Sequence, residues 1–168
     1  MPRRAAALAL LLAACEREPG PLDVEILQAL ARHQGDAVGE PFAGAYLILG
    51  ERVGCDCPTV MNIDLCTVLG LGAPAIPTQI LQQDGLLVLD LAGTVSYVGG
   101  VDQGGEFAVA AIIDASLIAA SGEIRSRIDG EFTDAGFTGT LQNRLVGTYV
   151  REDVDCHATV ALEAARAP

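Results

Sequence analysis

Residues 78–91 read Thr-Gln-Ile-Leu-Gln-Gln-Asp-Gly-Leu-Leu-Val-Leu-Asp-Leu, and this stretch decides the fold. Two apolar runs, Thr78–Gln83 and Leu86–Leu91, are joined by Asp84-Gly85. An Asp-Gly pair between two such runs is a strong short-range hairpin signal, because both residues tolerate positive φ. The stretch therefore predicts two antiparallel strands joined by a two-residue turn.

Short apolar runs separated by turn residues continue to the end of the chain. Residues 124–128 alternate between Ile or Ser and Arg, and Asp129-Gly130 after them is a predicted turn. Residues 156–163 alternate as a half-buried strand that would place Cys156 and His157 on opposite faces. Further strands are expected at 94–98, 106–114, 137–145 and 148–151, with a glycine-rich loop at 99–105. We predict a mainly β fold, an antiparallel up-and-down β-barrel or sandwich of about eight strands.

The first half of the domain carries one helix signal and one long insertion. Asp23 is a predicted N-cap, the apolar residues from Leu22 to Leu30 share a face, and Gly35 is the expected stop. His33 is expected in the last helical turn as a partner of the helix dipole rather than as a metal ligand. A first strand is expected at 42–49. Residues 54–78 are expected to form a disulfide-pinned plug or short helix that covers one end of the core.

The N-terminal residues predict export. Arg3 and Arg4 precede an unbroken Ala and Leu run, residues 5–14, which is too short to span a bilayer and is typical of a secretory signal. The last four residues of this segment, Leu12-Ala13-Ala14-Cys15, resemble the lipobox of bacterial lipoproteins. The resemblance implies removal of residues 1–14 and acylation of Cys15 on its sulfur and on its new amino group. We therefore expect a signal peptide at 1–14, a lipidated tether at 15–21 and a single β-rich domain at 22–168.

The other four cysteines are Cys55, Cys57, Cys66 and Cys156. In an exported domain they are expected to form two disulfides. A bridge between Cys55 and Cys57 would strain the required geometry, so Cys66 should pair with one of these two and Cys156 with the other. A metal site at these thiols and His157 is the alternative, and the strand pattern argues against it because Cys156 and His157 point apart. We expect no metal and no cofactor.

The amino-acid composition argues against several classes of function. Without the two arginines of the signal, eight arginines face 22 acidic residues, a balance that repels nucleic acid and anionic headgroups. The chain has no Lys, which excludes Schiff-base chemistry, and no Trp. Its serines, at 96, 116, 121 and 126, lie outside any Gly-x-Ser-x-Gly motif. A calcium site at Asp153 and Asp155 is a weaker alternative, since the EF-hand loop pattern is absent.

A Phe-x-Gly pattern occurs twice, as Phe42-Ala43-Gly44 and Phe137-Thr138-Gly139. With the strand spacing it is similar to calycin-type small barrels, although the Gly-x-Trp of lipocalins is missing. The resemblance implies a barrel and says little about activity.

Three functions remain open. We expect a non-enzymatic lipoprotein of the cell envelope, anchored to a bacterial membrane (the outer membrane in preference to the inner) and binding a partner or a small apolar ligand. The alternatives are a structural or surface-coat lipoprotein and a hydrolase with a carboxylate site in the barrel. A hollow interior would favour a small ligand, a packed interior would favour the structural role, and His157 with an acid in a cleft would favour an enzyme. The oligomeric state is left open.

Overall fold

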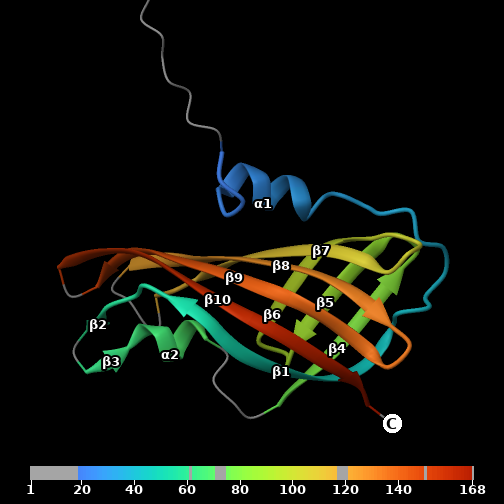
Figure 1. Ribbon diagram of the computed structural model, residues 1–168. Coiled ribbons are helices and arrows are strands. Elements are labelled where there is room, and N and C mark those ends of the chain that lie inside the picture. The colour runs from blue at the N-terminus through green and yellow to red at the C-terminus, as the bar shows by residue number, and fades with distance from the viewer. Residues whose placement is uncertain (1–18, 61, 71–74, 117–120, 150, 168) are drawn as a thin grey trace, which may run out of the picture.

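The computed structural model describes residues 19–60, 62–70, 75–116, 121–149 and 151–167. Eight antiparallel strands of this part close into a barrel in the order β1-β10-β9-β8-β7-β6-β5-β4 (Figure 1). From β4 onward each strand pairs with the next in sequence, and β1 closes the barrel between β10 and β4. The predicted up-and-down β fold is thus confirmed, as a barrel rather than a sandwich. The strands are β1 (Gly44–Cys55), β4 (Ile76–Gln83), β5 (Leu86–Leu91), β6 (Val95–Val101), β7 (Glu106–Asp114), β8 (Ser121–Thr133), β9 (Gly136–Tyr149) and β10 (Glu152–Arg166).

The predicted hairpin at Asp84-Gly85 is confirmed, with Gln83 paired to Leu86. Asp84 adopts a φ of 50°, but Gly85 is not among the positive-φ residues. Gly85 is needed for another reason: a Cβ there would lie 1.9 Å from the carbonyl oxygen of Gly35. The chain between the first helix and β1 therefore packs directly on this turn, where the Gly35 amide donates to the Gly85 carbonyl at 3.0 Å.

Three predicted turns or breaks were wrong because the strands are longer than the local pattern indicates. Gly99 and Gly100 belong to β6, Asp129-Gly130 lies inside β8, and Thr148 continues β9. A Cβ on Gly130 would lie 2.7 Å from the Cζ atom of Phe107, so this glycine makes room for an aromatic ring inside the barrel. The β8–β9 hairpin turns beyond Thr133 instead.

The predicted N-terminal helix is present as α1 (Val24–Leu30) and lies outside the barrel against β7 and β8 (Figure 1). Leu22 and Leu27 are buried against Ala110 of β7. The helix ends at Leu30, so the expectation that His33 lies in its last turn was wrong. Asp23 occupies the N-cap position without a side-chain capping bond.

The cysteine-rich insertion contains a small hairpin and a second helix. The hairpin pairs β2 (Thr59–Val60) with β3 (Ile63–Asp64), and α2 (Leu65–Leu69) follows directly. Asp64 caps α2 by accepting a hydrogen bond from the Cys66 amide at 3.0 Å. Leu65 and Leu69 are buried together with side chains of β9 and β10. The expected plug over one end of the core is therefore a short helix, in addition to the single helix predicted at the N-terminus.

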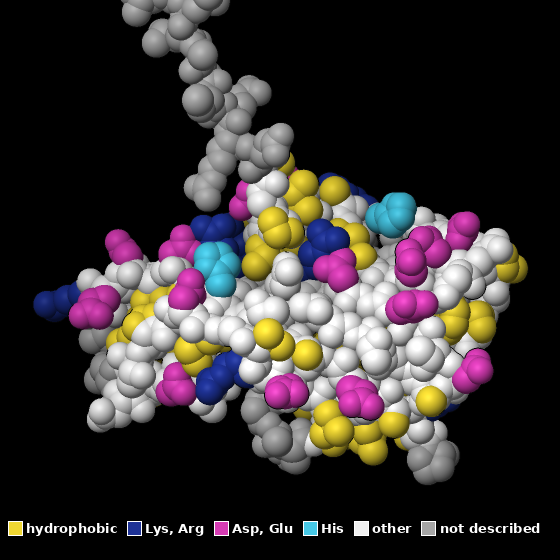
Figure 2. Space-filling model, viewed as in Figure 1, with side chains coloured by type: hydrophobic (Ala, Val, Ile, Leu, Met, Phe, Trp, Pro, Cys, Tyr) yellow, Lys and Arg dark blue, Asp and Glu magenta, His cyan; other side chains and the backbone are white. Residues whose placement is uncertain are grey.

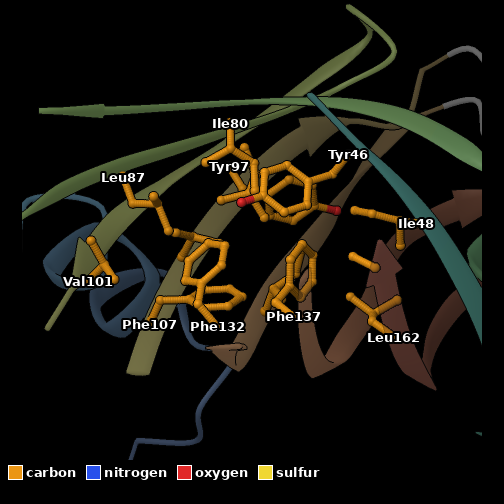
Figure 3. Packing of buried hydrophobic residues seen from close by; sticks show 14 of the residues in the cluster. Tyr46, Ile48, Ile80, Leu87, Tyr97, Val101, Phe107, Phe132, Phe137 and Leu162 are labelled. Atoms are coloured by element: carbon orange, nitrogen blue, oxygen red, sulfur yellow. The ribbon is translucent and has the colours of Figure 1, made fainter. Parts of the chain in front are cut away.

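Side chains fill the interior along the described strands. An aromatic cluster lies at the end of the barrel away from α2, where Phe107 and Phe137 meet edge to face at 5.3 Å (Figure 3). Phe132 stacks on Phe42 at 4.5 Å and touches both other rings. Aliphatic residues that are almost fully buried continue the core: Ile48, Ile80, Leu87, Leu89, Val101, Val109, Ile128 and Leu141.

Candidate functional site

The four domain cysteines form two disulfides, Cys55–Cys66 and Cys57–Cys156. This agrees with the predicted bridges and selects one of the two pairings that the sequence left open. The first closes a separation of 11 residues and fixes α2 to β1, and the second closes 99 residues and joins the insertion to β10. Both bridges brace the end of the barrel that α2 covers.

A metal centre finds little support at these residues. Asp56, Cys57 and Cys156 are the cluster of ligand-type atoms that lies within 4.8 Å in the described chain. The two sulfur atoms of this cluster are bonded to each other. A thiolate is the form of cysteine that binds metals, so this pair is not available as a ligand set.

His157 lies beside an acid, as the enzyme hypothesis requires, and lines a surface hollow, but both side chains of the pair are more than half exposed. Its Nδ1 is 3.6 Å from Asp56 Oδ2, and the two side chains are 52% and 67% exposed. Cys156, the preceding residue, is buried, so the predicted opposite facing of the two side chains is confirmed. An effective general base is normally shielded from water by its site, and this pair is not.

A clasp of charged side chains lies next to His157 in a hollow of about 590 Å³ between the start of α1 and strands β8–β10. Arg144 makes two 2.7 Å hydrogen bonds to Asp155 and lies 3.5 Å from Asp23. The bonds from Arg144 hold the pKa of Asp155 below its usual value, and burial opposes them. Because the arginine is already paired, this clasp ties the N-terminal end of α1 to the barrel rather than offering an anion site.

His33 lines a second hollow, of about 540 Å³, with the acidic residues Asp102, Glu106, Asp129 and Glu131. One of these acids, Asp129, is paired with Arg127 at 2.6 Å. The sequence predicts that His33 interacts with the C-terminal end of the helix dipole. In the structure it lies beyond the end of α1, next to these carboxylates. Asp153, considered for calcium, accepts a hydrogen bond from Thr148 at 2.9 Å, whereas Asp155 belongs to the clasp with Arg144.

A buried polar chain links the core to α2. The hydroxyl of Ser126 donates to Asn143 Oδ1, and Asn143 Nδ2 donates to the carbonyl of Leu69 at 2.7 Å. Burial raises the pKa of the nearby Tyr97 hydroxyl, and Ser126 opposes this shift. Buried polar atoms are costly unless they are paired, so this chain fixes the position of α2 over the barrel end.

An apolar groove of about 280 Å³ lies on the outside of the barrel between β1 and β4. We refer to it as the β1–β4 groove; Leu47 and Pro77 form its floor as cross-strand neighbours. Ala45, Ala92, Ala167, Gln79 and Asp90 also line it. Gln79 of β4 is paired with Ala45 of β1 on one side and with Asp90 of β5 on the other. Figure 2 shows hydrophobic side chains gathered at the lower edge of the view, where β1 and β4 lie in Figure 1. Alternation alone places Leu47 on the outer face, but no sequence pattern indicates that this face stays uncovered.

Cys15, the predicted lipidation site, lies outside the described residues. Within the part of the chain that the structure describes, the helices are too short to cross a bilayer. No protein-family model, curated protein or solved structure matches this chain. The similarity to calycin barrels therefore stays a prediction.

Proposed function

We propose that this protein is an exported lipoprotein, held on a bacterial membrane by acyl chains on Cys15, whose barrel binds a protein partner without enzymatic activity. The outer membrane is the expected site. The outward-facing apolar groove on a packed barrel is the observation that carries partner binding. The disulfides support export.

Export is supported by the state of the domain cysteines. Two disulfides join Cys55 to Cys66 and Cys57 to Cys156, and such bridges persist in oxidising compartments rather than in the bacterial cytosol. The sequence contains one further cysteine, Cys15, placed where the lipobox pattern requires it. Two acyl chains are sufficient to hold a protein on a membrane without help from the folded domain.

Partner binding is favoured over a small apolar ligand by how the barrel is filled. The described interior is packed with side chains such as Phe137 and Leu141, which are at most 1% exposed. By contrast, Leu47 and Leu49 on the outer face of β1 are 44% and 55% exposed, and Leu81 on β4 is 55% exposed. Exposed apolar patches commonly mark protein interaction sites. The groove lined by Leu47 also favours partner binding over a purely structural coat.

The number of residues between Cys15 and the folded domain supports the same proposal. Five peptide steps separate Cys15 from Gly20, a reach of at most about 18 Å. Gly20 leads into α1, which lies over β7 and β8, whereas β1 and β4 form the other side of the barrel (Figure 1). A membrane-anchored protein would therefore present its apolar strands away from the bilayer.

The anchor is tested in cells that produce the full chain, and the variant is Cys15→Ser. The control is the double variant Cys55→Ser with Cys66→Ser, which removes two thiols of the folded domain and keeps Cys15. We expect globomycin to increase the size of the wild-type protein, and Cys15→Ser to move it from the membrane to the soluble fraction. The control pair should stay with membranes. An unchanged precursor size and unchanged fractionation of Cys15→Ser would refute the lipoprotein assignment.

A hydrolase receives less support. Both side chains of the candidate pair, His157 and Asp56, are more than half exposed. The nearby Arg144 is hydrogen-bonded to Asp155. A carboxylate site inside the barrel would need acidic side chains among the buried residues. The buried polar residues of the described chain are Thr78, Gln82, Ser126 and Asn143, none of which is acidic.

A further inference from the structure

We propose that the β1–β4 groove binds a protein segment that inserts an arginine or lysine side chain, with its carbon stem over Leu47 and Pro77 and its cationic head on Asp90. This inference rests on the proposed partner-binding function and specifies the chemistry of the partner.

The groove has the composition that a long basic side chain requires. Leu47 and Pro77 are direct cross-strand neighbours, and Ala45 and Ala92 also line the groove. Arginine and lysine bury their methylene stems along apolar surface while keeping the charged group at a polar edge. A groove of about 280 Å³ with one carboxylate in its lining offers both environments.

Asp90 is held in position for this contact. Its Oδ1 accepts a hydrogen bond from the Gly93 amide at 2.9 Å, which fixes the carboxylate beside the turn that follows β5. Its Oδ2 has no hydrogen-bond partner among the described residues, so one oxygen is available to a cationic donor. Hydrogen bonds between ionised partners are stronger than neutral ones.

The surrounding charges favour the same partner. Glu51 follows Leu49 on the outer face of β1, and Glu163 is paired with Leu49 across β1 and β10. The ion pairs found in the described chain do not include Glu51, Asp90 or Glu163. Glu51 and Glu163 lie outside the lining of the groove, and Arg166 is a cation next to the lining residues Tyr46 and Ala167. Asp90 is the charged residue in the lining, and its carboxylate is complementary to a basic side chain with apolar neighbours.

The acidic residues of this face disfavour two other occupants. In a symmetric dimer through this face, the carboxylates of Asp90, Glu51 and Glu163 in the two copies would approach one another, and like charges repel. An anionic bilayer would be repelled for the same reason. A protein segment with a basic side chain and apolar neighbours is the occupant that matches both the apolar lining and Asp90.

The test is selection of a random twelve-residue peptide library on the immobilised full-length protein. We expect the enriched peptides to carry Arg or Lys next to apolar residues. Asp90→Asn should weaken their binding about fivefold, as for a partly exposed ion pair. Leu47→Glu should weaken it about tenfold or more, since apolar burial is lost.

Matched controls separate this groove from general attraction to an acidic protein. Asp102→Asn removes one carboxylate from the hollow that contains His33, and Ile112→Glu adds a charge to β7 at a residue that is 40% exposed, close to the 44% of Leu47. Both should leave peptide affinity within a factor of two.

Several results would overturn the inference: no enrichment, enriched peptides without basic residues, or equal losses in Asp90→Asn and Asp102→Asn. A concentration-dependent dimer abolished by Leu47→Glu would assign the groove to a second copy instead. Peptides that bind elsewhere would overturn this inference and leave partner binding in place. The anchor has its own readout, because fractionation of Cys15→Ser does not depend on the groove.

Discussion

The side-chain nitrogen of Asn143 lies 2.7 Å from the carbonyl oxygen of Leu69, a residue 74 positions earlier in the chain. Strand β9 thereby holds the last turn of α2 in the barrel end. The final carbonyls of a helix have no partner within the helix, so a buried helix end needs such a donor from elsewhere. This one contact connects the barrel core to the cysteine-rich insertion.

Asn143→Ala should destabilise the protein by about 2 kcal/mol, because the Leu69 carbonyl and the Ser126 hydroxyl would lose their partner in a buried setting. Urea unfolding followed by circular dichroism measures the loss. Gln142→Ala, at the neighbouring position that is half-buried on the other face of β9, is the control and should change stability by less than about 0.5 kcal/mol. Equal losses in the two variants would contradict the role assigned to Asn143.

The two disulfides should differ in their contribution to stability. Cys57–Cys156 closes 99 residues and Cys55–Cys66 closes 11, so the chain-entropy model assigns them about 5 and about 3 kcal/mol. We expect Cys57→Ala with Cys156→Ala to lower the free energy of unfolding more than Cys55→Ala with Cys66→Ala. The denaturant midpoints of the two double variants show which disulfide contributes more to stability. A larger loss on removing Cys55–Cys66 would contradict the prediction and show that packing in the folded state matters more than loop-closure entropy.

Acid stability should depend in part on Arg144. Its hydrogen bonds lower the pKa of Asp155 in the folded state. The stabilisation is therefore present above the unfolded pKa of about 3.9, and it is lost as pH falls below that value through the folded pKa. The Asp155 side chain is 52% exposed, so screening keeps the contribution of the pair below about 1 kcal/mol.

Arg144→Gln should thus raise the Asp155 pKa towards its ordinary value, as measured by NMR titration of the carboxyl carbon. Its destabilisation should be measurable near pH 6 and absent near pH 2. Arg127→Gln, which removes the partner of Asp129 instead, is the control and should leave the Asp155 titration unchanged. An unaltered Asp155 titration in Arg144→Gln would argue against the clasp.

Gly85→Ala should destabilise the barrel by about 2 kcal/mol, because the new Cβ would meet the backbone of Gly35, which cannot rotate away as a side chain could. Gly104→Ala is a suitable control, since a Cβ there meets nothing within 4 Å. Thermal unfolding of the two variants should separate them by several degrees. If both variants were as stable as the wild type, the close contact between Gly85 and Gly35 would be contradicted.

Local patterns predicted the strands where the inward and outward faces differ in polarity. The alternation from Cys156 to Glu163 placed Cys156 inside and His157 outside, as the structure has them. The patterns failed where glycines serve packing rather than turns. Gly130 and Gly99 read as breaks, yet each lies in a strand at a point where a side chain would strike a neighbouring chain segment.

The candidate groove was less predictable still. Leu47, Pro77 and Asp90 come from three different strands, and nothing in their local sequence connects them. Leu47 and Pro77 become neighbours because β1, the first strand in sequence, closes the barrel against β4 across the whole cysteine-rich insertion. A contact of that kind depends on closure, which is a property of the complete sheet.

The sequence by itself determined the strand-rich architecture, the hairpin at Asp84-Gly85 and the two candidate disulfide pairings, because alternation, turn chemistry and bridge geometry act over short stretches of chain. The tertiary structure alone decided which pairing forms, that α2 fills the barrel end, and that Leu47 and Pro77 remain uncovered. These outcomes depend on which strands become neighbours when the sheet closes into a barrel. Closure depends on many weak interactions between residues far apart in sequence, which no short stretch of chain contains.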